Sequence, residues 1–284
     1  MAERGRPLGN PDFTVRFWGV RGSIPCPGPD TVRYGGNTSC VEMRCGDRLL
    51  IFDGGSGLRP LGNALMRNGQ RLHFDLFYSH THLDHIVGVP FFAPCYQAHS
   101  DIRFWAGHLK PDSGIEDVLR RMMQAPLFPV PLDIFAAKRE FRDFDVGEDL
   151  HPHPGIRIRT APLNHPGGAT GYRVEYGGKA AAYITDTEHR PGGLDKNVLQ
   201  LVDHADLMIY DATYTDEEYP SHHGWGHSTW QEAVRLAEAA QVKTLAIFHH
   251  DPDHDDGFMD RVASEATAMR PGTIVAKEGL VLSL

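Results

Sequence analysis

One short segment constrains this chain more than any other part of its sequence. It follows an apolar run at residues 73–79, which predicts a buried strand, and it consists of His80, Thr81, His82, Leu83, Asp84 and His85. In an extended turn His80 and His82 point the same way, while Asp84 and His85 fold back. The loop can therefore offer nitrogen atoms to one metal ion and a carboxylate plus a nitrogen to a second. This pattern predicts a site for two metal ions.

The composition of the whole chain indicates a folded protein that repels polyanions. The chain has 284 residues, 41% of them hydrophobic and 23% charged, which is enough to fill a core. Its 37 acidic side chains exceed its 28 basic ones, for a net charge of −9. Such a chain as a whole repels nucleic acids and acidic membrane surfaces, so we expect no general nucleic-acid polymer as partner.

The cysteine spacing and the lack of long apolar stretches bear on the cellular compartment and on membrane association. The four cysteines form no CxxC pair and are too few for a disulfide scaffold in a chain of this length. The first residues carry charge without an apolar signal region, and 18 consecutive apolar residues occur nowhere. We therefore expect a cytoplasmic protein with no membrane partner.

Apolar patterning predicts β-rich segments that alternate with helices. In the first half we expect strands at 13–18, 39–45, 48–52 and 73–79, and helices at 56–67, with Ser56 as N-cap, and 113–124. In the second half we expect strands at 156–161, 171–176, 179–185, 207–210, 244–248 and 273–275, with helical segments at 194–202, 229–240 and 256–269. Residues 107–153 are interpreted as a lid-like insertion.

The ligand-rich loop resembles that of the metallo-β-lactamase superfamily of binuclear hydrolases. The signature of that family implies one further histidine, a carboxylate that bridges both metal ions and a last histidine, each at the end of a core strand. His165, Asp186 and His249 stand at such positions, and Asp53 matches an aspartate turn that supports the ligand loop. The resemblance covers about residues 13–255.

The resemblance implies a fold and a set of ligands. The expected fold is a single α/β domain over residues 1–284, a four-layer αββα sandwich with two mixed sheets between outer helices. The expected cofactors are two divalent metal ions, with zinc favoured and manganese as the alternative, which activate a bridging hydroxide. The implied ligands are His80, His82 and His165 for the first ion, Asp84, His85 and His249 for the second, and Asp186 for both.

A second motif favours the phosphodiesterase branch of the family. His227, in the segment His-Ser-Thr before a predicted helix, resembles a histidine of ribonuclease Z that lies beside the phosphate. It precedes His249 by 22 positions, as in that family, and this spacing selects His249 over His250. The resemblance implies that His227 protonates the leaving oxygen or steadies the phosphate. Asp211 stands where ribonuclease Z has a glutamate, and it either orients His227 or caps its own turn.

The size of the substrate is bounded by what the chain lacks. In the ribonuclease Z family, which this chain resembles, a basic arm between the third histidine ligand and the bridging aspartate grips tRNA, whereas here Asp186 follows His165 by only 21 positions. The insertion at 107–153 carries six basic and nine acidic side chains, so it is not basic either. We expect hydrolysis of a phosphodiester in a small anionic substrate, a cyclic nucleotide or cyclic sugar phosphate. The alternatives are a thioester or lactone hydrolase and an RNA-processing nuclease.

Several other polar residues have two interpretations each. Arg21 either clamps a phosphate or lies solvated in its loop. Asn37 either approaches a phosphate or belongs to an ordinary β-turn, and for Asn37 we favour the β-turn. The isolated His108 is interpreted as a packing or surface residue, and His153 as part of a proline turn without partners. His189, His222 and His223 lie near the motifs and are candidates to line the pocket. The oligomeric state is open, with a homodimer as one option.

Overall fold

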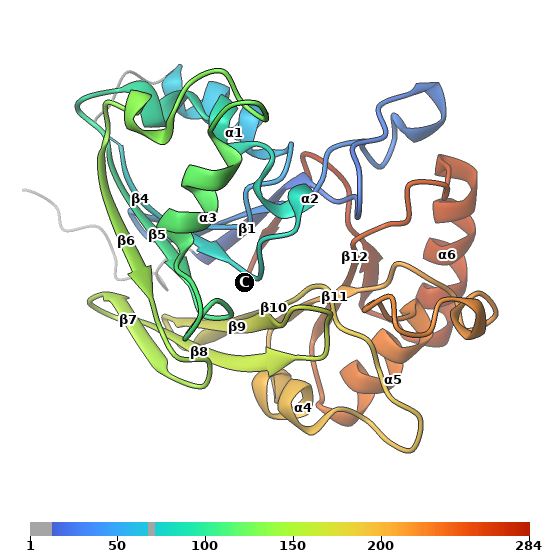
Figure 1. Cartoon of the computed structure of the whole chain (residues 1–284). Coiled ribbons are helices and arrows are strands. Elements are labelled where there is room, and N and C mark those ends of the chain that lie inside the picture. Colours follow the sequence, from blue (N-terminus) through green and yellow to red (C-terminus); the bar gives the residue numbers. More distant parts are fainter. Residues whose placement is uncertain (1–12, 68–71) are drawn as a thin grey trace, which may run out of the picture.

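Two seven-stranded sheets lie face to face, with helices on both outer faces. The computed structural model describes residues 13–67 and 72–284. Helices α1 (Leu58–Met66) and α3 (Ile115–Met122) cover the first sheet, and α4 (Lys196–Val202), α5 (Trp230–Ala239) and α6 (Asp256–Met269) cover the second (Figure 1). The expected four-layer αββα sandwich is confirmed.

Both sheets are mixed. The first contains, in order, β14 (Val281–Ser283), β1 (Phe13–Gly19), β2 (Cys40–Cys45), β3 (Arg48–Phe52), β4 (His73–Tyr78), β5 (Asp101–Ala106) and β6 (Lys138–Asp143). The second contains β13 (Thr273–Val275), β12 (Thr244–Phe248), β11 (Leu207–Asp211), β10 (Lys179–Ile184), β9 (Ala169–Tyr176), β8 (Ile156–Leu163) and β7 (Asp149–His153). Strands β3 to β6 are parallel to one another, as are β10 to β13.

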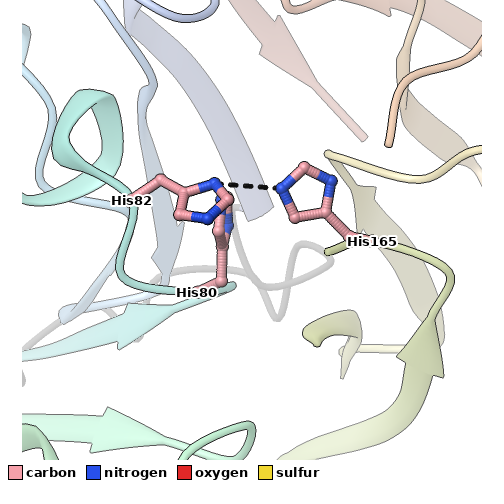
Figure 2. Close-up of side chains that lie close together, drawn as sticks. All are labelled: His80, His82 and His165. Atoms are coloured by element: carbon pink, nitrogen blue, oxygen red, sulfur yellow. Dashed lines mark hydrogen bonds between the residues drawn. The ribbon is translucent and has the colours of Figure 1, made fainter. Parts of the chain in front are cut away.

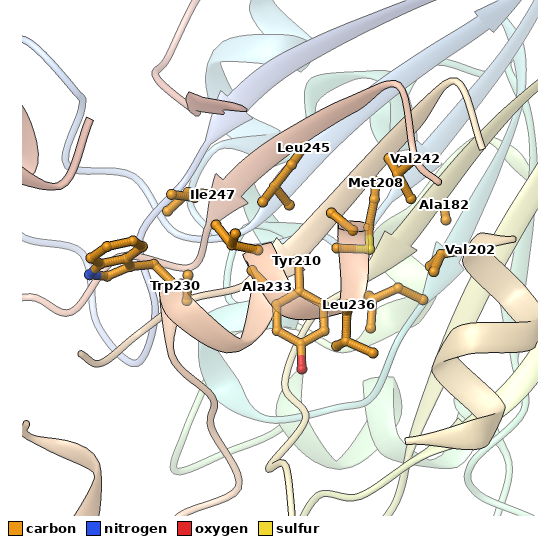
Figure 3. Close-up of a cluster of buried hydrophobic side chains, with 14 of the residues drawn as sticks. Ala182, Val202, Met208, Tyr210, Trp230, Ala233, Leu236, Val242, Leu245 and Ile247 are labelled. Carbon is orange, nitrogen blue, oxygen red and sulfur yellow. The ribbon is translucent and has the colours of Figure 1, made fainter. Parts of the chain in front are cut away.

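Three apolar clusters hold the layers together. One packs the second sheet against α4, α5 and α6 through side chains such as Met208, Leu236 and Ile247 (Figure 3). A second packs the first sheet against α1 and α3, and the third fills the space between the sheets. In the third cluster Phe52 of the first sheet meets Tyr172 and Tyr183 of the second, and Phe77 also meets Tyr172, with ring centroids 5.4 to 5.8 Å apart.

The strand ends deliver the candidate ligands to one edge of the sandwich. His80 follows β4, Asp186 follows β10, and His249 directly follows β12. Since β10, β11 and β12 are parallel, the residues after them emerge at the same edge. A short helix, α2 (Leu83–Ile86), carries the second half of the ligand loop at this edge.

The predicted strands and helices are present in the structure, with ends shifted by up to two residues. Four strands were not predicted: β5, β6, β7 and β14. The insertion at 107–153 supplies β6 and β7, the edge strands of the two sheets, besides α3 and a 3-10 turn at Leu132–Ile134. Its role as a lid stays a prediction. Further 3-10 turns lie at Pro29–Thr31, Val89–Phe91, Ala93–Tyr96 and Tyr219–Ser221.

Two local predictions were wrong. Ser56 is not the N-cap of α1: Gly57 holds that position, while the Ser56 hydroxyl donates to Asn37. His153 is not a loop residue without partners, because it lies in β7 with Nε2 2.8 Å from Asp75 Oδ2. Asp75 comes from β4, and a partner from the opposite sheet leaves no trace in the local sequence.

No helix in the described part of the chain is long and apolar enough to cross a membrane. The cytoplasmic location expected from the sequence stays a prediction.

Replacing Phe52 with alanine tests the inter-sheet cluster. The Phe52 ring is fully buried and contacts aromatic rings from both sheets, so Phe52→Ala leaves a cavity and should lower the free energy of unfolding by about 3–5 kcal/mol. Urea denaturation measures this change. The control Leu127→Ala removes a side chain that is 76% exposed and should stay within about 0.5 kcal/mol of the parent. Equal effects of the two changes would refute the assigned role of Phe52.

Candidate metal centre

Among the described residues, four groups of side chains could hold a metal ion. Two of them include His227, and the other two share no residue and lie side by side at the sheet edge. His80, His82 and His165 form one group, and Asp84, His85, Asp186 and His249 form the other. Within each group the ligand atoms lie within 4.8 Å of one another. Figure 2 shows the first group, in which Nε2 of His165 lies 3.0 Å from Nδ1 of His82. All seven ligands expected from the sequence are therefore brought together, in the two expected sets.

Asp186 joins the two groups. Its Oδ2 lies 3.5 Å from Nε2 of His80 and 3.7 Å from Nε2 of His165. Its Oδ1 lies 3.2 Å from Nε2 of both His85 and His249. One carboxylate oxygen thus faces each group, which is the arrangement that a bridging ligand requires.

Unusual backbone conformations place two of the candidate ligands and the neighbouring Asp53. Asp53, Asp186 and His249, each directly or closely after a strand, have positive φ values of 60°, 51° and 60°. Residues other than glycine seldom adopt this conformation, and it costs of the order of 1–3 kcal/mol at each position. The surrounding core therefore imposes these turns, and each turn redirects the chain where a strand ends at the site.

Hydrogen bonds on the outer side of the rings fix their orientation. Nδ1 of His85 lies 2.8 Å from Asp53, Nδ1 of His249 lies 3.0 Å from Thr213 Oγ1, and Nδ1 of His165 lies 2.8 Å from the Gly226 carbonyl. These contacts leave the Nε2 atoms turned inward, as in histidines that bind metal ions.

Three histidine nitrogens that face the interior of the site indicate whether a cation fits there. In the described chain, Nε2 of His80, His85 and His249 is buried and has no hydrogen-bond partner. Buried polar atoms are rarely left without a partner, and three imidazole nitrogens converging on carboxylates are a donor set typical of zinc and related divalent ions. The residues present therefore fit the two metal ions that the sequence predicts.

Three of the candidate ligands have the charge that this fit requires. Burial lowers the pKa of His80 well below its ordinary value, and it lowers the pKa of His165, so both rings stay neutral. Burial alone would raise the pKa of Asp186, but His249, His85 and His80 hold it well below its ordinary value. Neutral imidazoles and an ionised carboxylate are the protonation states that bind divalent cations. His85 differs before a cation binds: burial lowers its pKa, but Asp84, Asp186 and Asp53 raise it well above its ordinary value.

Asp53 supports the ligand loop, residues 80–85, through hydrogen bonds to Ser79 and His85. It is fully buried; its Oδ1 accepts from the Ser79 backbone N–H at 2.7 Å, and its Oδ2 lies near the Ser79 hydroxyl, the Tyr183 hydroxyl and Nδ1 of His85. The carboxylate thus ties the start of the loop, one ligand and the opposite sheet together. This is the supporting position that the resemblance implies.

His227 and Asp211 lie against both groups. The His227 ring centroid is 4.9 Å from that of His249 and 5.4 Å from that of His165. Nδ1 of His227 lies 3.0 Å from Asp211 Oδ2. Burial alone would lower the pKa of His227, but Asp211 and Asp186 raise it to about 9.

Asp211 satisfies both interpretations left open by the sequence. Its Oδ2 lies at His227 and accepts from the Thr187 N–H at 3.0 Å, while its Oδ1 accepts from the Thr213 N–H and hydroxyl. The carboxylate orients His227 and also closes its own turn. Since Thr213 contacts His249, the same turn supports a candidate ligand.

Arg21 is neither a phosphate clamp on the surface nor a solvated loop residue. Its side chain is fully buried and donates to the carbonyls of Gly35, Asp251 and His254. These bonds hold the loop at 21–36 against the segment after His249. Asn37 is also a structural residue, as favoured, because its side chain and backbone N–H both donate to Glu278.

The loop that Arg21 anchors reaches the second ligand group. The Ser23 N–H donates to Asp84 Oδ2 at 2.8 Å. A Cβ at Gly22 would lie 2.3 Å from the His249 ring, so only glycine fits this approach.

The remaining histidines near the motifs contact aromatic or polar side chains. His189 stacks on Tyr219, His222 stacks on Tyr214, and His223 lies 3.5 Å from Glu188. His108, interpreted from sequence as a packing or surface residue, lies next to the site: its Nε2 is 3.1 Å from Thr81 Oγ1, and its ring is 6.4 Å from that of His80. It stands alone between β5 and α3, so no local pattern reveals its position.

Comparisons with known proteins agree with this geometry. The family model described as the Beta-lactamase superfamily domain matches residues 52–250. The chain belongs to this superfamily. A ribonuclease Z of Parabacteroides distasonis is 25% identical over 96% of this chain and 99% of its own length.

Two solved structures are similar to this superfamily member over nearly the whole chain. The metallo-beta-lactamase fold protein YhfI from Bacillus subtilis has a TM-score of 0.73 at 21% identity, covering 96% of this chain and 100% of its own. A diphosphatase from the PhnP family has a TM-score of 0.67 at 20% identity, covering 96% and 97%. At these identities the structural likeness concerns the fold alone.

Removing the charge of Asp53 should weaken metal binding. Asp53→Asn keeps the shape of the side chain but loses the acceptor that orients His85, so we expect affinity for Zn²⁺ to fall about 10- to 100-fold. Competition with a chromogenic chelator measures the affinity.

The matched control for this change is Asp75→Asn. Asp75 is also a fully buried aspartate, but it bonds to Trp105 and His153 rather than to a candidate ligand. Its loss should lower the free energy of unfolding and leave zinc affinity near that of the parent. Equal zinc affinity in Asp53→Asn and the parent would contradict the supporting role of Asp53.

Proposed function

We propose that this metal-dependent hydrolase cleaves a phosphodiester bond in a small cyclic phosphate, a cyclic nucleotide or cyclic sugar phosphate. The observation that carries the proposal is the position of Asp186 between two groups of ligands, with His227 next to both. Two neighbouring cations with an acid beside them suit the chemistry of phosphate diesters.

The ligands would be divided as the two groups indicate. His80, His82 and His165 would hold one ion, and Asp84, His85 and His249 the other, with Asp186 on both. The first set is all nitrogen, which favours zinc, with manganese as the alternative. When bound, such a pair of cations lowers the pKa of water and neutralises charge on the phosphate.

His227 supplies the proton for the leaving oxygen. Because its Nδ1 is fixed on Asp211, the proton is delivered from Nε2. The raised pKa keeps the ring protonated at neutral pH, and bound cations would oppose that rise. The Asp211 carboxylate therefore has the task of holding a proton on His227 in a cationic surrounding.

The surroundings of the site support a small substrate. Between His165 and Asp186 the chain forms β9 and β10 joined by tight turns, with no protruding arm among these described residues. Net charge is −9, and the segment at 107–153 is acidic, so a long polyanion meets repulsion outside the ligands.

An RNA-processing nuclease is the second candidate, because relatives that match nearly the full chain are named ribonuclease Z. A panel of substrates separates the candidates. Purified, metal-loaded protein is assayed with cyclic phosphates, a 3′-extended tRNA and a thioester. The proposal predicts turnover of a cyclic phosphate well above that of the tRNA and the thioester. Preferred cleavage of the tRNA would establish the second candidate instead.

Removal of the His227 ring should abolish most catalysis without loss of metal. His227→Ala deletes the proton donor but no proposed ligand, so kcat on a cyclic phosphate or on bis(p-nitrophenyl) phosphate should fall about 10²- to 10⁴-fold. Elemental analysis should find the parent's metal content. His204→Ala, at an exposed position remote from the ligands, is the control and should retain the parent's kcat. An unchanged rate in His227→Ala would end the assigned role.

The pH profile tests the partnership of His227 with Asp211. An acid must be protonated to act, so kcat falls as the pH rises through the pKa of His227. The Asp211 carboxylate raises that pKa, and Asp211→Asn should therefore move the alkaline limb of the kcat profile to lower pH by about 1–3 units. A limb that stays in place would show that Asp211 does not set the pKa of the acid.

A further inference from the structure

Trp225 stands out among the four tryptophans of the chain. It is 61% exposed, whereas Trp105 and Trp230 are buried and Trp18 is half-buried. Large aromatic rings at the surface are costly to hydrate and often mark binding surfaces. Trp225 belongs to neither of the proposed ligand groups, and the chemistry described above does not use it.

The segment that carries Trp225 is anchored next to the metal ligands. Gly226, the next residue, accepts a hydrogen bond at its carbonyl from Nδ1 of His165, and a Cβ at Gly226 would lie 2.2 Å from that nitrogen. His227 follows directly. The tryptophan is thus two residues from the proposed acid, at most about 7 Å of extended chain.

Glu188 holds this segment in a fixed conformation. Its carboxylate accepts from the Gly224 N–H at 3.0 Å and from the Gly226 N–H at 2.8 Å, the residues on either side of Trp225. Both glycines have positive φ values, 85° and 86°, which turn their N–H groups toward one carboxylate. An exposed ring on a segment bonded at both sides is pre-organised rather than loosely attached.

A row of rings connects Trp225 with the site. His222 packs edge-on against Trp225 at 4.9 Å and stacks on Tyr214 at 4.2 Å, and Tyr214 lies 6.1 Å from His227. The Trp225 ring is therefore supported on one side by His222 and still has most of its surface exposed.

We propose that Trp225 is a specificity-determining residue that stacks on a planar base carried by the substrate. The inference rests on the proposed function, and it selects a nucleoside phosphate over a sugar phosphate without a base. A nucleotide carries its base one ribose away from its phosphate, and Trp225 is two residues from His227 in the chain. Stacking of a base on an aromatic side chain changes affinity about 5- to 150-fold.

Equilibrium binding to the metal-loaded protein tests the inference without requiring turnover. The probes are adenosine 5′-monophosphate and ribose 5-phosphate, which share a phosphate and a ribose but differ in the base, and titration calorimetry gives the two dissociation constants. The parent should bind the nucleotide more tightly. Trp225→Ala should reduce the preference for the nucleotide about 5- to 150-fold, and Trp225→Phe should retain most of it.

The control is Met269→Ala, which removes a side chain that is 54% exposed at the end of α6 and should keep the parent's preference. A nucleotide preference that is equal in the parent and in Trp225→Ala overturns the inference, as does a parent that binds both probes equally. If the preference depends on Trp225 but no diester is hydrolysed, the base subsite stands and the proposed function fails.

Discussion

The site depends on keeping the ionised carboxylate of Asp186 in a place that water does not reach. Asp186 is 1% exposed, and a buried charge is tolerated only where opposite charge or hydrogen bonds compensate it. Four imidazole rings turn an Nε2 atom toward its two oxygens at 3.2 to 3.7 Å. Metal ions held by these residues would supply positive charge next to this buried carboxylate.

The two sheets meet this requirement by ending their strands at one edge. The loop after β4 belongs to the first sheet, whereas the turns after β8, β10 and β12 belong to the second, and the aromatic cluster around Phe52 fixes the sheets relative to each other. Asp53 crosses from one sheet to the other through Tyr183. A shift of one sheet relative to the other would therefore separate the two groups of ligands. The contacts of Asp53 with Tyr183 and His85, which oppose such a shift, are buried.

The sequence alone predicts which candidate ligand residues lie together, but it predicts their surroundings poorly, and the reason is physical. His80 to His85 form a contiguous pattern, and His165, Asp186 and His249 each follow a recognisable apolar strand. The bonds of Arg21 to the segment after His249, of His153 to Asp75 and of Glu188 to Gly224 and Gly226 join residues far apart in the chain. Charged edge strands such as β6 lack a continuous apolar run, so they too escape prediction.

Metal stoichiometry reports whether two metal ions share Asp186. Elemental analysis of protein equilibrated with zinc should give two ions per chain for the parent. Asp186→Asn loses the anion that faces both groups and should retain fewer than two, with circular dichroism confirming that the fold persists. A single ion in the parent, or two tightly held ions in Asp186→Asn, would show that Asp186 is not shared by two metal ions.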